Sequence, residues 1–167
     1  MSAVLKDEIP NIRPMRDSDL AMVMAIEREA YSFPWSEGIF RDCLRAGYCC
    51  WVVAQGGAIR AYGIMQVAAG ESHILNLCVR ADDRRQGVGR LLLSHLLEVA
   101  KAHRADTALL EVRPTNLAAL RLYAAVGFNE VGVRRGYYPG RGGREDALIL
   151  AMSLDGSGDH TDKKNPA

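Results

Sequence analysis

Net charge, long apolar runs and paired cysteines are all scarce in this sequence, and each absence excludes a class of protein. The 21 Lys and Arg residues nearly balance the 20 Asp and Glu residues, so no basic field favours direct nucleic-acid binding. No apolar run is long enough to cross a bilayer as a helix, and residues 6–8 are charged where a secretory signal would be apolar. We therefore expect a cytoplasmic protein with no nucleic-acid partner and no membrane partner.

The four cysteines, at positions 43, 49, 50 and 78, do not form the C-x-x-C spacing of a structural zinc site or a redox motif. A chain of 167 residues can bury a sizeable core, so it does not need disulfides for stability. The cysteines are expected to be buried free thiols, and no metal is expected.

The length also indicates one domain, because 167 residues are too few for two ordinary cores. Residues 155–167 are small and polar without periodicity, which predicts a disordered tail. Residues 1–10 carry no convincing pattern and are treated as an N-terminal extension. The folded domain is expected over residues 11–154, with no internal repeat.

Hydrophobic periodicity divides this domain into helices and strands. Helices are expected over Leu20–Ala30, from Ser36, over Val88–Val99 and over Asn116–Val126; strands are expected over Tyr48–Gln55, Ala58–Ala69, Ser72–Val79, Ala108–Val112, Phe128–Arg134 and Ala147–Leu154. With one further strand before the first helix, the order is β-αα-βββ-αβ-αββ. This order predicts an α/β (α+β) fold: a mixed, mostly antiparallel twisted sheet with helices on both faces.

Two glycines and three arginines stand together in residues 84–90, where the chain turns from a strand into a helix. A helix start presents unpaired backbone N–H groups and a partial positive charge, and glycines let a phosphate approach that backbone. A Rossmann motif would need glycine at the position of Leu92, and the Gly-Lys-Ser/Thr of a P-loop is absent. The segment predicts a pyrophosphate site, although an ordinary helix start with solvated arginines would share the pattern.

Glu111 interrupts an otherwise apolar strand, and the helix that follows carries Asn116 and Tyr123 on one face at positions i and i+7. These three polar groups could line one crevice. Alternatively, Glu111 is a strand-end carboxylate that pairs with Arg113 or faces water.

The Arg-x-x-Gly-x-Gly-Arg pattern of residues 84–90 resembles the CoA pyrophosphate motif of the GNAT superfamily of N-acetyltransferases. Further segments resemble its RimI type across about the whole folded domain: Phe33-Pro34-Trp35-Ser36, Leu110-Glu111-Val112-Arg113, Thr115-Asn116 with Leu122-Tyr123, and Arg134–Pro139 with Gly143–Ala147. This resemblance implies the GNAT fold and acetyl-CoA as cosubstrate. It places the pantetheine arm of acetyl-CoA against Leu77, Cys78 and Val79. It places the phosphates against Arg85, Gln86, Gly87, Val88, Gly89 and Arg90, and makes Asn116 a further CoA contact.

The resemblance also makes Glu111 the proton acceptor and Tyr123 the proton donor. Acetylation of an amine needs a base for the ammonium and an acid for the leaving thiolate. An N-terminal ammonium has a pKa of about 8, against about 10.4 for lysine, so its deprotonation is the less demanding one for a carboxylate acting through water. We expect direct attack on the thioester, with a backbone N–H of residues 77–79 polarising its carbonyl.

The acceptor implied by the resemblance is the N-terminal alanine of the eighteenth protein of the small ribosomal subunit, which is followed by aromatic and basic residues. Its peptide would lie between the loop of Phe33–Ser36 and a loop of Tyr137–Ala147, against Phe33, Trp35, Tyr137 and Tyr138. The aromatic residues could instead serve as hydrophobic staples and strand corners. Acetylation of lysines, polyamines or antibiotics, and CoA binding without catalysis, remain the competing hypotheses. The sequence assigns no oligomeric state.

Overall fold

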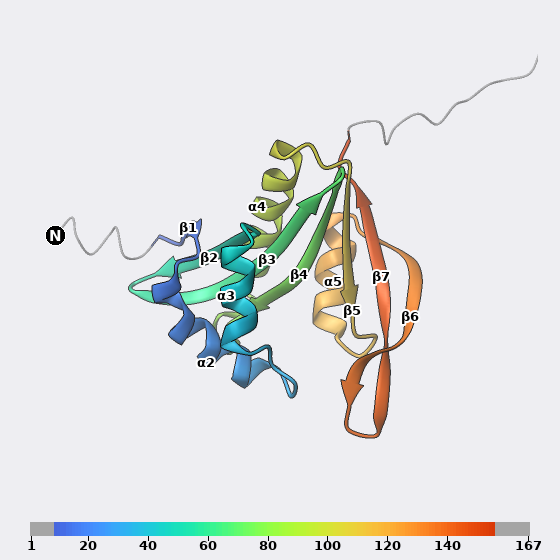
Figure 1. Cartoon of the computed structure of the whole chain (residues 1–167), viewed down its shortest axis with the longest axis horizontal. Helices are drawn as coiled ribbons and strands as arrows, with labels where there is room; N and C mark the ends of the chain where they lie inside the picture. Colours follow the sequence, from blue (N-terminus) through green and yellow to red (C-terminus); the bar gives the residue numbers. More distant parts are fainter. Residues whose placement is uncertain (1–8, 156–167) are drawn as a thin grey trace, which may run out of the picture.

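The computed structural model describes residues 9–155, and the predicted extension and tail lie almost wholly outside them. The elements in chain order are β1 (Asn11–Pro14), the 3-10 turn η1 (Asp17–Asp19), α2 (Leu20–Ala30), α3 (Glu37–Arg45), β2 (Cys49–Gln55), β3 (Ala58–Ala68), β4 (Glu71–Val79), the 3-10 turn η2 (Ala81–Asp83), α4 (Val88–Ala102), β5 (Thr107–Val112), α5 (Leu117–Val126), β6 (Asn129–Gly140) and β7 (Gly143–Ser153) (Figure 1).

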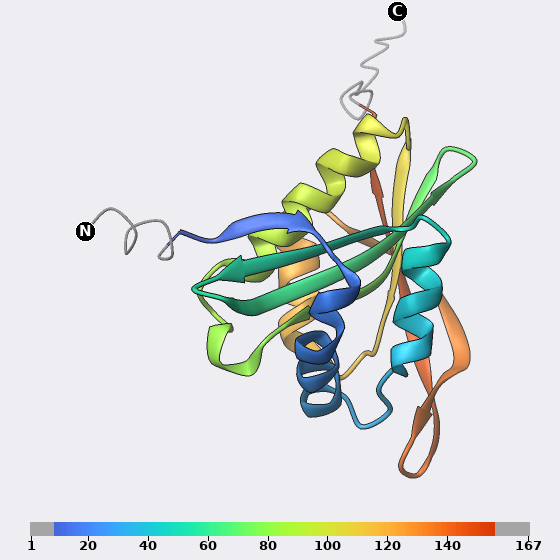
Figure 2. The ribbon, with the colours of Figure 1, turned by 60° about the vertical axis from the view of Figure 1, so that its left-hand side comes forward.

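One sheet of seven strands in the order β1-β2-β3-β4-β5-β7-β6 forms the centre of the molecule. Neighbouring strands are antiparallel except for β4 and β5, which are parallel because α4 carries the chain back across the sheet. Helices α2 and α3 cover one face, and α4 and α5 cover the other (Figures 1 and 2). The predicted mixed sheet with helices on both faces is confirmed.

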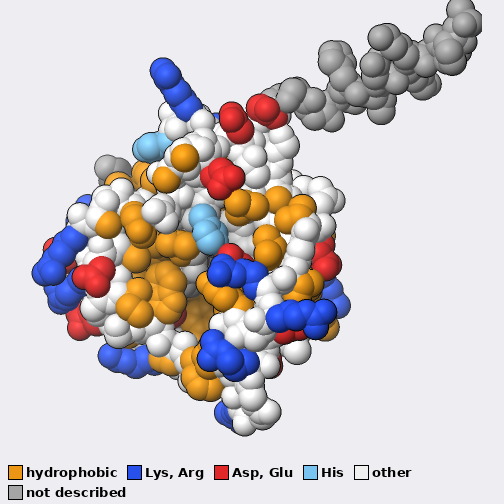
Figure 3. Space-filling model, turned by 45° about the vertical axis from the view of Figure 1, so that its right-hand side comes forward, with side chains coloured by type: hydrophobic (Ala, Val, Ile, Leu, Met, Phe, Trp, Pro, Cys, Tyr) orange, Lys and Arg blue, Asp and Glu red, His pale blue; other side chains and the backbone are white. Residues whose placement is uncertain are grey.

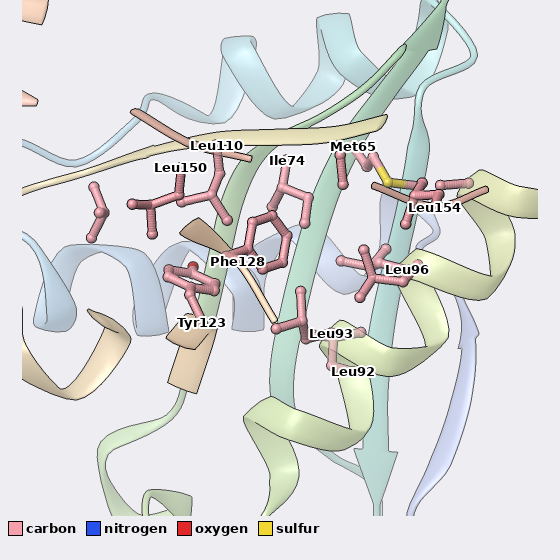
Figure 4. Close-up of a cluster of buried hydrophobic side chains, with 14 of the residues drawn as sticks. Met65, Ile74, Leu92, Leu93, Leu96, Leu110, Tyr123, Phe128, Leu150 and Leu154 are labelled. Atoms are coloured by element: carbon pink, nitrogen blue, oxygen red, sulfur yellow. The ribbon is translucent and has the colours of Figure 1, made fainter. Parts of the chain in front are cut away.

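Each face of the sheet has its own hydrophobic core. The larger core lies beneath α4 and α5, and Figure 4 shows Leu92, Leu93 and Leu96 of α4 pointing into it. The smaller core lies beneath α2 and α3 and includes the fully buried Phe40. The helical spacing of the apolar residues in 88–99 predicts one buried face that includes Leu91, but Leu91 is 43% exposed while the adjacent leucines fill the core.

The last two strands are longer than predicted. The sequence indicated a loop from Tyr137 to Ala147, whereas these residues belong to a hairpin that turns between Gly140 and Gly143. Arg144 crosses the hairpin and donates from its Nε to the carbonyl of Gly136 at 2.5 Å. The prediction of a loop was therefore wrong.

Strands β4 and β5 stay together only at one end. Their pairing runs from Glu71 opposite Thr107 to Ile74 opposite Leu110 and then ends. Beside this point the β3–β4 register shifts by one residue, as in a β-bulge, which bends a strand. The remaining five residues of β4, 75–79, separate from β5 and leave a splayed opening near the middle of the sheet.

Candidate active site

The free edge of β4 presents backbone groups to this opening. Arg80 donates its backbone N–H to the Arg60 carbonyl of β3, and hydrogen-bonded pairs alternate along antiparallel strands. The backbone groups of Leu77 and Val79 therefore point away from β3 and toward the opening, whereas those of Cys78 point toward β3. Of the three residues predicted to contact the pantetheine arm, Leu77 and Val79 therefore present backbone groups at the free edge of β4, and Cys78 contributes a buried thiol.

Two side chains already donate hydrogen bonds to backbone carbonyls on this edge. The Tyr31 hydroxyl donates to the Leu77 carbonyl at 3.4 Å, and the Arg84 Nε donates to the Val79 carbonyl at 3.3 Å. Burial raises the pKa of Tyr31 above the ordinary phenol range, so its hydroxyl keeps the proton that it donates. Tyr31 was not identified from the sequence.

The predicted pyrophosphate loop forms the start of α4. Gly87 has a φ of +78°, a conformation that favours glycine, and it precedes the first helical residue, Val88. The first intrahelical bond runs from Leu91 N to Gly87 O, so the preceding N–H groups of the loop have no helical carbonyl to bind. A Cβ on Gly89 would lie 3.2 Å from Val79 Cγ2, which leaves little room for a side chain between α4 and β4.

An ion-pair cluster, missed by the sequence reasoning, holds the start of this loop. Asp83 is 2% exposed and accepts from Arg60 Nη1 at 2.5 Å and from Arg80 Nε at 2.7 Å. Because Arg60 belongs to β3 and Asp83 belongs to η2, the loop is fastened directly to the sheet.

Glu111 lies at the mouth of the opening, one residue past the last β4–β5 pair. Its side chain is 12% exposed, and it lies 2.5 Å from His73 Nε2 and 3.2 Å from Arg134 Nη1. Arg113, the partner considered from the sequence, instead binds Glu145 at 2.6 Å. Glu111 is therefore neither paired with Arg113 nor simply solvated.

Tyr123 approaches the opening from the other face of the sheet. It is 7% exposed in the core beneath α4 and α5, with its ring edge-on to Phe128 at 5.7 Å (Figure 4). Burial, followed by the nearby Tyr138 and Cys78, raises the pKa of Tyr123 above the ordinary phenol range. Glu111 and Tyr123 thus lie on opposite faces, with the opening between them.

Asn116 does not share the burial of Tyr123. It is exposed, and its side chain accepts from Ala119 N at 3.2 Å as the N-cap of α5. The expected helix therefore begins one residue later, at Leu117.

The loop of residues 33–36 joins α2 to α3 beside the opening. Ser36 caps α3. The ring centroids of Trp35 and Phe40 lie 5.3 Å apart, and this contact is a hydrophobic staple. The staple considered for Trp35 is therefore present. Phe33 has no such burial and is 47% exposed.

Glu27 fixes this loop to the sheet from beneath. Its carboxylate is 1% exposed and accepts from Trp35 N at 3.3 Å, from Asn76 Nδ2 at 3.2 Å and from the Tyr62 hydroxyl. The sequence held a signal for this residue, because Glu27 continues the apolar spacing of Leu20 on the buried face of α2. We call these four residues the Glu27 network.

The β6–β7 hairpin carries the remaining aromatic pair, Tyr137 and Tyr138, with ring centroids 4.8 Å apart. Arg134 lies 4.4 Å over the Tyr137 ring, and Arg113 lies 4.4 Å over the Tyr138 ring. Burial, with the Tyr137 ring nearby, raises the pKa of Tyr138 to about 12. Tyr137 is 39% exposed and remains accessible to solvent.

Figure 3 shows a hollowed face on which hydrophobic side chains gather around a histidine, with Lys and Arg side chains nearby.

All four cysteines are free, and three of them are buried. Within residues 9–155 no three His, Cys, Asp or Glu side chains are grouped so that they could hold a metal ion. In the same part of the chain, no helix has the length and apolar character needed to cross a membrane.

Comparison with known proteins extends these observations. The model of the acetyltransferase (GNAT) family matches residues 20–128. The ribosomal protein bS18-alanine N-acetyltransferase of Escherichia coli is 41% identical over 143 residues, which cover 86% of this chain and 97% of that protein. The enzyme of the same name from Haemophilus ducreyi is 34% identical and is covered over 99% of its length, against 86% of this chain.

Solved structures agree with this result. The crystal structure of the ribosomal-protein-S18-alanine N-acetyltransferase from Escherichia coli matches with a TM-score of 0.82 at 39% identity, over 91% of this chain and 98% of that chain. Ard1 from Thermoplasma volcanium, at 22% identity, shares the fold with a TM-score of 0.79 over 86% of this chain and 97% of its own. On the family model, the sequence identity and the shared fold, this chain belongs to the GNAT family of acetyltransferases.

Proposed function

We propose that this protein transfers the acetyl group of acetyl-CoA to the N-terminal alanine of ribosomal protein bS18, in the cytoplasm. The observation that carries the proposal is the opening between β4 and β5, with a carboxylate on one face of the sheet and a buried phenol on the other. The 41% identity to the Escherichia coli enzyme supports the choice of acceptor.

The residues around the opening fit acetyl-CoA as cosubstrate. The unpaired N–H groups before α4 and the arginines at positions 84, 85 and 90 suit a pyrophosphate. The outward backbone of Leu77 and Val79 suits the amides of a pantetheine arm, which could pair with β4 much as a strand would. Asn116, the N-cap of α5, is proposed as a further contact for acetyl-CoA.

Glu111 accepts a proton from the N-terminal ammonium of the acceptor, through a water molecule. The neutral amine then attacks the thioester carbonyl, and an edge N–H of Leu77 or Val79 stabilises the developing oxyanion. The attacking nitrogen releases its second proton to solvent as the C–S bond breaks. Tyr123 protonates the leaving thiolate from the opposite face. Its raised pKa keeps the phenol protonated at neutral pH, so the acid is present when the thiolate forms.

The acceptor peptide enters on the face that carries Glu111. Phe33 and Tyr137 are exposed on the 33–36 loop and on the hairpin, and they are available for the aromatic residues that follow the alanine. Trp35 and Tyr138 contribute more indirectly, since the first holds the loop and the second supports Tyr137.

The test is mass spectrometry of the protein incubated with acetyl-CoA and a peptide that begins Ala-Arg-Tyr-Phe. A matched peptide is blocked at its N-terminus and carries a free lysine. We expect acetylation only of the free N-terminus. Acetylation of the lysine would replace the proposed acceptor with a broader amine specificity, and binding of CoA without modification of either peptide would refute the proposed activity.

A further inference from the structure

We propose that His73 is a positioning residue for acetyl transfer, which holds the Glu111 carboxylate at the point where β4 and β5 separate. The inference rests on the proposed function, in which Glu111 is the proton acceptor. It starts from a close contact across the two strands, because His73 Nε2 lies 2.5 Å from Glu111 Oε2.

The register of the strands explains why these two side chains meet. His73 lies opposite Leu109, and the next pair, Ile74 with Leu110, is the last before the strands separate. Alternate residues of a strand share a face, so Glu111 is on the same face as Leu109 and lies diagonally across from His73. The imidazole therefore bridges the junction at its open end.

The hydrogen bond has a defined direction. A carboxylate oxygen accepts, so the imidazole donates through Nε2–H. The Glu111 side chain is only 12% exposed, and a shielded carboxylate needs partners for both of its oxygens. His73 supplies the partner of Oε2, and Arg134 supplies the partner of Oε1.

These two partners differ in how firmly they are held. Arg134 has a side chain that is 50% exposed, forms the longer bond of 3.2 Å, and also lies over the Tyr137 ring of the hairpin. His73 is 33% exposed, has fewer rotatable bonds, and stands on a strand in the middle of the sheet. Without His73, we expect the carboxylate to turn toward Arg134 and away from the opening.

Three variants of the whole chain test this role. His73→Val removes the imidazole but keeps a residue that suits a strand. His73→Gln keeps an N–H that can reach the same carboxylate oxygen. His103→Gln is the matched control, because His103 is an exposed histidine that contacts Val99 O at the end of α4.

Steady-state acetylation of the alanine peptide is measured at one fixed pH for all variants. His73→Val should lower kcat about 10-fold and leave the KM for acetyl-CoA unchanged, because a misplaced base slows the chemical step. His73→Gln should recover most of the loss, and His103→Gln should match the wild type. A general loss of folding would not be repaired by glutamine alone.

The control for the proposed function is Glu111→Gln. If Glu111→Gln is inactive while His73→Val keeps the wild-type kcat, the inference about His73 is overturned and the proposed function stands. If both variants keep wild-type rates, the proposed proton acceptor and its positioning residue are both wrong.

Nitrogen NMR of the imidazole provides a readout that does not depend on turnover. The wild-type protein should show His73 protonated on Nε2, and Glu111→Leu should remove that preference because the acceptor is gone. A wild-type His73 that carries its proton on Nδ1 alone would contradict the proposed hydrogen bond.

Discussion

Replacing Glu27 with alanine removes the acceptor at the centre of the Glu27 network. Three donors lose their partner there: Trp35 N, the Tyr62 hydroxyl and Asn76 Nδ2. Only the Tyr62 hydroxyl is fully buried, and the donors of Trp35 and Asn76 are part-buried. A buried donor left unpaired costs about 1–3 kcal/mol and a part-buried one less, so the free energy of unfolding should fall by about 2 kcal/mol or more. That loss is a large share of the about 5–15 kcal/mol that stabilises an ordinary domain.

Urea unfolding, followed by tryptophan fluorescence, measures this change, and Trp35 is itself part of the network. Glu29→Ala is the matched control, because Glu29 lies on the same helix and is exposed. Tyr62→Phe removes only the hydroxyl donor, so it should lower the free energy of unfolding by less, about 1–2 kcal/mol. If the free energies of unfolding of Glu27→Ala and Glu29→Ala differ by less than about 0.5 kcal/mol, the reasoning about the buried carboxylate is refuted.

Further outcomes follow for catalysis, cofactor binding and pH. Glu111→Gln and Tyr123→Phe should each lower kcat about 100-fold in the peptide assay, and wild-type rates in both would exclude the proposed acid and base. Gly89→Ala should raise the KM for acetyl-CoA a few-fold, because its Cβ would press on Val79 at 3.2 Å; an unchanged KM would show that the loop adjusts freely. Burial raises the pKa values of Tyr62 and Tyr123, so the unfolded chain ionises first as the pH rises. The raised pKa values of the four cysteines act in the same direction from about pH 8.5. The free energy of unfolding should therefore fall above about pH 8.5 and more steeply above about pH 10, where the fall should be shallower in Tyr62→Phe; urea titrations at several pH values measure these slopes.

The order of helices and strands followed from the sequence because periodicity reports which face of each element is buried. The start of α4 was equally predictable, since glycine at position 87 and the arginines around it are local signals. The hairpin after Arg134 was mistaken for a loop because its pairing involves cross-strand contacts, such as that of Arg144 with Gly136, which local propensity does not record.

The candidate site was harder to predict wherever it depends on strand order. Glu111 stood out as a carboxylate in an apolar strand, but its partners His73 and Arg134 come from strands that are far from it in sequence. Only the parallel register of β4 and β5 brings His73 within reach. Glu27 is different, because its place on the buried face of α2 was already visible in the spacing.

The splayed opening also divides the sheet into two leaves. Strands β1–β4 form one leaf and β5–β7 the other, and within residues 9–155 the four residue pairs from Glu71 to Ile74 are the only strand pairing between them. A pantetheine arm bound along Leu77 and Val79, as proposed, would act as a short substitute strand that completes the missing part of this seam. Binding of acetyl-CoA and mechanical joining of the two leaves would then be one event, so the cosubstrate would also be a structural element of the sheet during each turnover.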